Sequence, residues 1–453
     1  MNIINLDLII LVIGLPFVLW TWMFRPRRFA SQISLFSSTV HAQYSWLVSW
    51  SLAKFCIFLL ALDGIRQRPV GLAPFLPFVG YVLLSSLVAS VFWNIPGGVS
   101  FFYGEARIFV SLFNFMLLVL STMSLAVAFT GSQAGRTLWY GLRWLAVVHG
   151  VFFLYQYVAM ALGWPLIGIS RAHGLTFGDQ IADVAAFVTG SGLEILRPGG
   201  LAGEPKTVAV IFGMVLFVTL YVGHQLDSKR HERFFTICAA LLSFFCFFAT
   251  FSTSAFFGLG AAFVGTKLIL KWNYSYQIGK RLLLFIVPVL LVLLTFFSMS
   301  DFSSLLFERT TGRLSDALDP PVEASLHAMM NSVPIALFGT GEGGSSFVIM
   351  KYLNSPFEYA FAPNIGFIRL AVENGLIGLL LFFVAYALLT KRALLMLRSD
   401  RSDVRLLFFT TSISTMFLCM AGSGISLGIP LSIASMYAAQ ARRTDVESTR
   451  CAA

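Results

Sequence analysis

The sequence has few charged residues. Only 11% of its 453 residues are Asp, Glu, Lys or Arg, whereas 57% are hydrophobic. A soluble globular protein has about a quarter charged residues, because its surface must be solvated. The shortage excludes soluble, disordered and disulfide-rich secreted proteins. Apolar stretches of about 20 residues, long enough to cross a bilayer core of roughly 30 Å, recur along the chain. The composition therefore predicts a polytopic membrane protein.

The motifs of metal and nucleotide chemistry are also missing. The six histidines are scattered without an HExxH motif, the five cysteines form no CxxC, and no P-loop or GxSxG occurs. Residues 339–344 match GxGxxG, but no strand precedes them, so we predict a tight turn. We expect chemistry without a metal or a cofactor. The net charge of +10 indicates cationic loops on one side of a membrane, not nucleic-acid binding.

The apolar stretches predict an all-α fold of about 12 transmembrane helices within a single integral membrane domain, residues 1–453. A helix satisfies its own backbone polar groups in lipid, and no alternating pattern of a barrel is present. The sequence contains no internal repeat. The predicted spans are residues 5–23, 46–63, 72–92, 107–129, 138–163, 205–223, 234–250, 253–271, 280–298, 364–390, 405–421 and 424–439.

The distribution of Lys and Arg predicts the orientation of the chain. Cations cluster in residues 224–233, 267–281 and 391–405 and in the C-terminal tail, which we expect to be cytoplasmic. Two long loops, residues 164–204 and 299–363, then lie outside and contain eleven of the 21 acidic residues. Arg25, Arg27 and Arg28 disagree with this scheme. Either the first hairpin breaks the rule, or residues 29–45 dip into the membrane and change the count.

The first outer loop ends in a candidate anion site, residues 197–209. Arg197 can present a planar charged fork to phosphate oxygens. Glycines at 199, 200 and 203 permit close backbone approach. Glu204 precedes a helix start that carries Lys206. The alternative is a turn and a helix cap with interfacial charges.

The second outer loop and the helix that follows it carry two further charge patterns. Arg309 and Arg313 are four residues apart and share a face if they are helical, which suits an anion between them. Solvated arginines near lipid headgroups are the alternative. Arg369 and Glu373 are also four apart, near the outer end of a predicted span. This pair suits either a structural ion pair or a catalytic role.

Three stretches together resemble one known family. Residues 197–209 have an Arg-x-x-Gly…Pro pattern, and residues 251–260 form a serine-containing helix start. Residues 309–383 run from an Arg-rich start through a Pro-x-x-x-x-Gly-x-Gly turn to an Asn and Leu-x-x-Glu-x-Gly-Leu-x-Gly. This order resembles the O-antigen polymerase and O-antigen ligase superfamily of bacterial inner-membrane glycosyltransferases. The family commonly has a His before the Asn, but here Pro363 occupies that position. The ligase branch is thereby disfavoured.

The resemblance implies a polymerase that joins polyprenyl-diphosphate-linked oligosaccharide repeats at the periplasmic face of the inner membrane, with O-antigen, capsular or exopolysaccharide as product. A flippase and a chain-length regulator are the expected protein partners. For the diphosphate we expect Arg197, Arg309 and Arg313, then Arg369 and Lys206. For the proton acceptor we rank Glu204 before Glu373, and then His173 and His327. The alternatives are an O-antigen ligase and, from another class, a transporter or flippase of lipid-linked saccharide.

Overall fold

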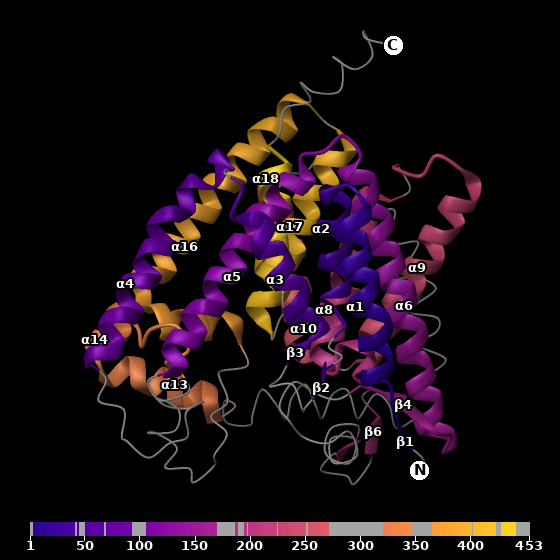
Figure 1. Cartoon of the computed structure of the whole chain (residues 1–453), viewed down its shortest axis with the longest axis horizontal. Coiled ribbons are helices and arrows are strands. Elements are labelled where there is room, and N and C mark those ends of the chain that lie inside the picture. Colours follow the sequence, from indigo (N-terminus) through magenta and orange to yellow (C-terminus); the bar gives the residue numbers. More distant parts are fainter. Residues whose placement is uncertain are drawn as a thin grey trace.

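The architecture comes from a computed structural model (Figure 1), in which part of the chain is described. The described residues are 3–40, 43–44, 50–67, 69–92, 106–169, 186–188, 194–196, 198–223, 225–250, 252–270, 320–345, 365–400, 402–422 and 427–440.

Long apolar helices dominate these residues. Within the described ranges, nine helical segments are long and apolar enough to cross a membrane. They comprise α1 (Asp7–Phe24), η1 with α4 (Val70–Phe75 and Leu76–Phe92), α5 (Ala106–Phe129), α6 (Ala134–Leu162), α8 (Pro205–Val222), α9 (Arg230–Ala249), α10 (Thr253–Leu270), α16 (Gly366–Ser399) and α17 (Asp403–Ala421). Helix α1 exposes Leu8, Val12 and Ile13, an apolar surface suited to lipid. The prediction of an all-α membrane protein is confirmed.

The predicted count of about 12 spans is not reached in the described residues. Helices α3 (Leu52–Gly64) and α18 (Gly428–Ala438) are too short, and α18 rises only about 16 Å. Helix α3 starts at Leu52 because the preceding residues Trp50–Ser51 (β3) pair with Gln43–Tyr44 (β2), and the Ser51 hydroxyl caps the helix. The predicted span at 280–298 lies outside the described residues.

A short polar helix, α2 (Arg27–Ser37), begins with two of the three cations that disagreed with the predicted orientation. It turns back beside α1 (Figure 1) and buries Ser31, which lies 3.3 Å from Ser124 of α5. Arg27 at its start lies 3.6 Å from Asp63, where α3 ends. Whether the first hairpin breaks the orientation rule or residues 29–45 dip into the membrane stays a prediction.

The segments predicted as outer loops contain secondary structure, which lies at the end of the bundle opposite to the start of α2. Figure 1 shows β1, β4, α13 and α14 at the lower end. In the first segment, Leu166–Gly168 (β4) pairs in parallel with Ile3–Asn5 (β1), Ala186–Val188 (β5) pairs with Glu194–Leu196 (β6), and η2 covers Gly200–Ala202. The second segment contains α13 (Pro320–Asn331) and α14 (Val333–Phe338). These elements correct the prediction of plain loops.

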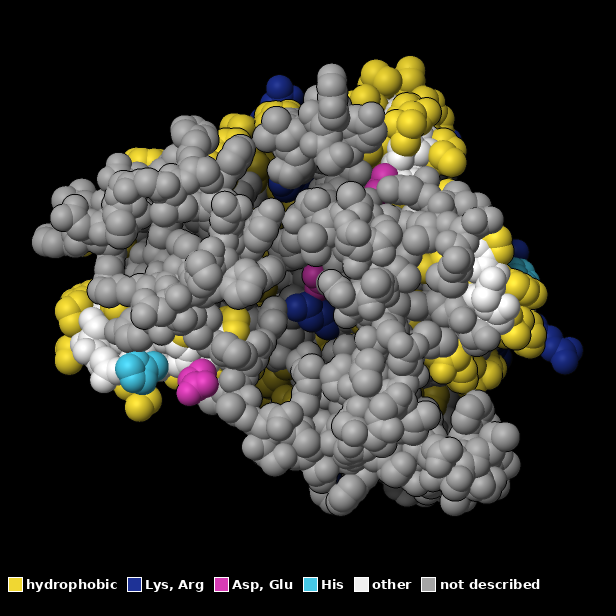
Figure 2. Space-filling model, turned by 90° about the horizontal axis from the view of Figure 1, so that it is seen from below, with side chains coloured by type: hydrophobic (Ala, Val, Ile, Leu, Met, Phe, Trp, Pro, Cys, Tyr) yellow, Lys and Arg dark blue, Asp and Glu magenta, His cyan; other side chains and the backbone are white. Residues whose placement is uncertain are grey.

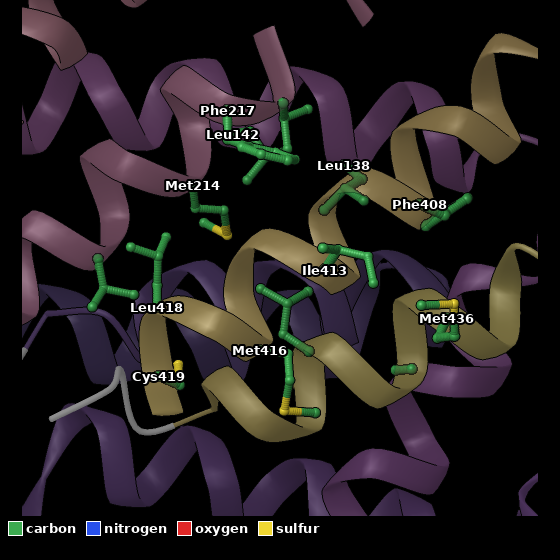
Figure 3. Packing of buried hydrophobic residues seen from close by; sticks show 14 of the residues in the cluster. Leu138, Leu142, Met214, Phe217, Phe408, Ile413, Met416, Leu418, Cys419 and Met436 are labelled. Carbon is green, nitrogen blue, oxygen red and sulfur yellow. The ribbon is translucent and has the colours of Figure 1, made fainter. Parts of the chain in front are cut away.

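The core is built around α8 and α17. Every residue of α8 from Thr207 to Val222 is buried, so this helix is enclosed by its neighbours. Figure 3 shows the interface, where Met214 of α8 points toward α17, the helix that carries Ile413 and Leu418. Helix α8 begins at Pro205, which suits a first helical position because that position needs no amide proton.

Helix α17 is polar for a buried membrane helix. Its hydroxyls mostly donate to carbonyls one turn earlier, as Thr410 does to Leu406 at 2.7 Å and Thr415 to Thr411 at 2.7 Å. The Ser412 hydroxyl instead lies 2.9 Å from that of Tyr386 on α16. Small hydroxyl residues let membrane helices approach closely while their polar groups stay satisfied.

Candidate active site

Four of the residues predicted to bind substrate lie outside the described residues: His173, Arg197, Arg309 and Arg313. Their roles therefore remain predictions. The structure does describe Glu204, Lys206, His327, Arg369 and Glu373, which occur in three places at the same end of the bundle.

The first place is the start of α8. Lys206 Nζ lies 3.6 Å from Glu204 Oε2, and both side chains are partly exposed. The glycine-rich turn before them packs on itself, since a Cβ at Gly199 would lie 2.6 Å from the carbonyl of Gly203. The predicted reason for these glycines, close approach to a ligand, is thus met at Gly199 by the loop's own backbone. Glu204 and Lys206 form an ion pair beside a helix N-terminus.

The second place is α13, where His327 is exposed. Its ring lies 2.9 Å from the side-chain amide of Asn331, one turn further along the helix. Figure 2 views this end of the molecule from below, with a basic and an acidic side chain together near the centre and hydrophobic side chains toward the rim.

The third place is a break in α16. Gly375 has a φ of 64° and interrupts the helix, and a Cβ there would overlap the carbonyl oxygen of Leu337. A Cβ at Gly339 would likewise overlap the carbonyl oxygen of Glu373. The backbone of the glycine-rich turn therefore touches the backbone of the break. Only residues without a side chain allow this approach.

The turn after α14 replaces the helical hydrogen bonds lost at the break. The amide of Thr340 donates to the carbonyl of Val372 at 2.9 Å, and the amide of Gly341 donates to that of Glu373 at 2.9 Å. Gly339, Gly341 and Gly343 all have positive φ, which confirms that residues 339–344 form a tight turn. Buried carbonyls need such partners, so the turn and the break stabilise each other.

The charged pair next to the break is asymmetric. Glu373 is 3% exposed, whereas Arg369 is 47% exposed. Arg369 Nε donates to both carboxylate oxygens of Glu373, at 3.1 and 3.2 Å, and the Ser345 hydroxyl donates to Glu373 Oε1 at 2.7 Å. The carboxylate thus accepts three hydrogen bonds from two donor groups. The guanidinium is oriented from one side and open on the other.

A second carboxyl group, Glu342, belongs to this site and was missed in the sequence. It is half-buried within the glycine turn, and its amide donates to the Ser86 hydroxyl of α4 at 2.8 Å. Burial and the nearby Glu373 charge raise the pKa of Glu342 to about 8, against the opposing effect of Arg369. The position of Glu342 between Gly341 and Gly343 was the sequence signal that could have identified it as a site residue. The contact with Ser86, 256 residues earlier, was not predictable.

The structure therefore brings together Arg369, Glu373 and Glu342, while Glu204 and Lys206 form a separate pair at the same end. Among the described residues, no group of three or more His, Cys, Asp or Glu side chains could hold a metal ion. No protein-family model matches the chain, and a search of curated proteins finds no match.

Proposed function

We propose that this protein is a membrane glycosyltransferase that polymerises oligosaccharide repeat units carried on a polyprenyl diphosphate. The observation that carries the proposal is the Arg369–Glu373 pair, which lies near the start of a broken membrane helix. In this pair a buried carboxylate orients a half-exposed arginine side chain. A charged residue in such a helix is costly and is retained where it binds something. The resemblance to the O-antigen polymerase and ligase superfamily points to the lipid diphosphate as that partner.

The guanidinium suits a diphosphate headgroup. Glu373 uses the Nε of Arg369, and the two terminal nitrogens make no hydrogen bond with the described residues. Two parallel N–H groups match two oxygens of a phosphate. The same helix exposes Leu376 and Leu380, an apolar surface along which a polyprenyl chain could lie. The headgroup and the tail of the substrate would thus meet one helix.

The chemistry needs no nucleotide, because the diphosphate is already a good leaving group. Charge develops on it as the bond to the donor sugar breaks, and fixed cations stabilise that charge. A carboxylate accepts the proton of the acceptor hydroxyl. In the proposal Arg197, Arg309, Arg313 and Lys206 assist Arg369, and Glu204 or Glu373 takes the proton, with His173 and His327 as further substrate contacts.

We infer that this end of the bundle faces the periplasm of a bacterial inner membrane. Arg27 and Arg136 contact partners at the other end, and cations gather on the cytoplasmic side of membrane proteins. The C-terminus would then be cytoplasmic. A flippase would supply the lipid-linked repeats, and a chain-length regulator would limit the polymer.

One observation favours a second candidate, a transporter of lipid-linked saccharide. Broken membrane helices with a charged group at the break are common in transporters, and α16 is such a helix. The missing internal repeat argues against this function. An O-antigen ligase shares the donor lipid and stays an alternative within the superfamily, but Pro363 removes its expected histidine.

The purified protein in lipid vesicles, supplied with a lipid-diphosphate-linked repeat unit, tests the proposal. We expect polymer to form without any ion gradient, and we expect Arg197→Ala, Arg309→Ala and Arg369→Ala to abolish elongation while the protein inserts normally. Absence of polymer with wild-type protein, together with gradient-dependent movement of the lipid, would establish the transporter. In cells, loss of a polymerase leaves single repeats, whereas loss of a ligase leaves long polymer on the carrier lipid.

A further inference from the structure

We propose that Glu342 accepts the proton of the attacking sugar hydroxyl, while Glu373 acts only as the positioning residue for Arg369. The inference rests on the proposed function and deepens it, because it assigns the two carboxyl groups of one site to different tasks. It replaces Glu204 and Glu373 as the preferred proton acceptors.

The main chain of Glu342 is fixed from two sides. On one side its amide donates to Ser86 of α4, and a Cβ at Gly341 would lie 3.0 Å from Ala89 of that helix. On the other side the amide of Gly341 donates to the carbonyl of Glu373 at 2.9 Å. The turn is thus clamped between α4 and the broken helix. A side chain on such a support keeps its position while a substrate binds.

The carboxyl group of Glu342, unlike its backbone, makes no hydrogen bond with the described residues, whereas the Glu373 carboxylate receives three. A carboxylate that is already saturated by an arginine and a serine has little capacity to take a proton from a substrate. Glu204 is also engaged, because it pairs with Lys206. Of these three acids, Glu342 has the most available oxygens.

The surrounding charges suit proton transfer near neutral pH. The charged groups that act on Glu342 are Glu373 and Arg369 of α16. From α4, the Ser86 hydroxyl accepts from the Glu342 amide, and the Tyr81 hydroxyl donates to the carbonyl of Phe338. Burial and Glu373 raise the pKa of Glu342 to about 8. A proton acceptor works best when its pKa lies near the working pH.

The proposed step transfers one proton and exchanges one bond at the anomeric carbon. The acceptor hydroxyl transfers its proton to the Glu342 carboxylate, and its oxygen forms a bond to the anomeric carbon of the donor sugar. The bond from that carbon to the diphosphate oxygen breaks, and its electron pair leaves with the lipid diphosphate, which Arg369 neutralises. The proton later passes from Glu342 to water. No oxidant, reductant or further co-reactant takes part.

The variant Glu342→Gln tests the inference in the vesicle assay. We expect the turnover rate to fall by about 100-fold or more, the usual effect of removing a general base. The affinity for the lipid diphosphate, measured by titration with donor lipid alone, should stay within about twofold of wild type because Arg369 is untouched. Glu342→Asp should restore part of the rate. Glu323→Gln is the matched control, since Glu323 is an exposed acid on neighbouring α13.

The pH profile separates a proton acceptor from a merely structural residue. The wild-type rate should rise with pH up to about 8 and then level off, because ionised Glu342 is the active form. The residual rate of Glu342→Gln should lack that rise. A wild-type rate and profile in Glu342→Gln would overturn the inference and leave the proposed function intact. Absence of polymer with wild-type protein would instead overturn the proposed function.

Discussion

Two ion pairs lie at opposite ends of this molecule and differ in how far they are buried. Arg143 of α6 and Asp227, before α9, are 1% and 0% exposed, with Nη1 and Oδ1 2.8 Å apart. Trp139 and Thr236 donate to the same carboxylate at 2.8 and 2.7 Å. The carboxylate is saturated and no part of the pair is open. In the Arg369–Glu373 pair, by contrast, the arginine side chain is 47% exposed.

The difference separates structural from functional ionisable groups. A sealed pair joins helices, because its two buried charges compensate each other. An open pair keeps binding capacity on one member, which is what an anionic substrate needs. Arg143 belongs to a sealed pair because α6 starts at Ala134 and carries Arg143 into the bundle. Variants of the two pairs should therefore differ in whether they lose stability or activity.

The largest loss of stability is expected from Asp227→Asn. The change leaves the Arg143 charge buried without a counterion, which costs about 3–5 kcal/mol. Thermal unfolding in detergent should show a strongly lowered Tm, if the variant accumulates at all. The double variant Arg143→Met with Asp227→Leu should recover much of the loss, because it removes both charges. Wild-type stability in Asp227→Asn would contradict the sealed-pair interpretation.

A smaller loss is expected from Gly375→Ala. A φ of 64° strains a residue with a side chain by about 1–3 kcal/mol, and the new methyl group would also push against Leu337. The turn that holds Glu342 would shift, so polymer formation should be lost together with some stability. The control is Gly80→Ala on α4, where no heavy atom lies within 4 Å of the added Cβ. It should stabilise by roughly 0.5–1 kcal/mol and leave activity unchanged.

Arg369→Lys should change stability by less than about 1 kcal/mol, because the arginine is half-exposed and the new ammonium can still pair with Glu373. Activity should nevertheless fall at least tenfold, since Lys lacks the two parallel donors. The measurements are Tm in detergent and initial rates of polymer formation. A variant with full activity would show that the open pair has no specific role in binding.

The smallest effect is expected from Arg136→Ala, near the sealed Arg143–Asp227 pair and its neighbours, here called the sealed cluster. Arg136 is 61% exposed and lies 3.8 Å from Glu232, a distance typical of a weak surface pair. Stability should change by less than about 1 kcal/mol, and the difference should shrink in high salt. Neither stability nor activity should approach the losses expected for Asp227→Asn and Arg369→Lys. A large loss here would mean that the sealed cluster extends to the surface.

Local patterns predicted the regular parts of this protein. The long spans, the ion pair between Arg369 and Glu373 and the turn at residues 339–344 all depend on neighbours in the sequence. The predictions that failed depended on distant partners. The span at 46–63 starts late because of the β2–β3 pairing, and the long outer segments contain elements such as α13.

The sequence by itself determined that this protein lies in a lipid bilayer. Its residues are 57% hydrophobic, and apolar stretches of about 20 residues are stable within a membrane. It also determined that α16 carries an arginine and a glutamate one turn apart. Only the tertiary structure decided which charges are sealed and which are open. That outcome depends on partners remote in sequence, such as Asp227 for Arg143, and composition does not encode such contacts.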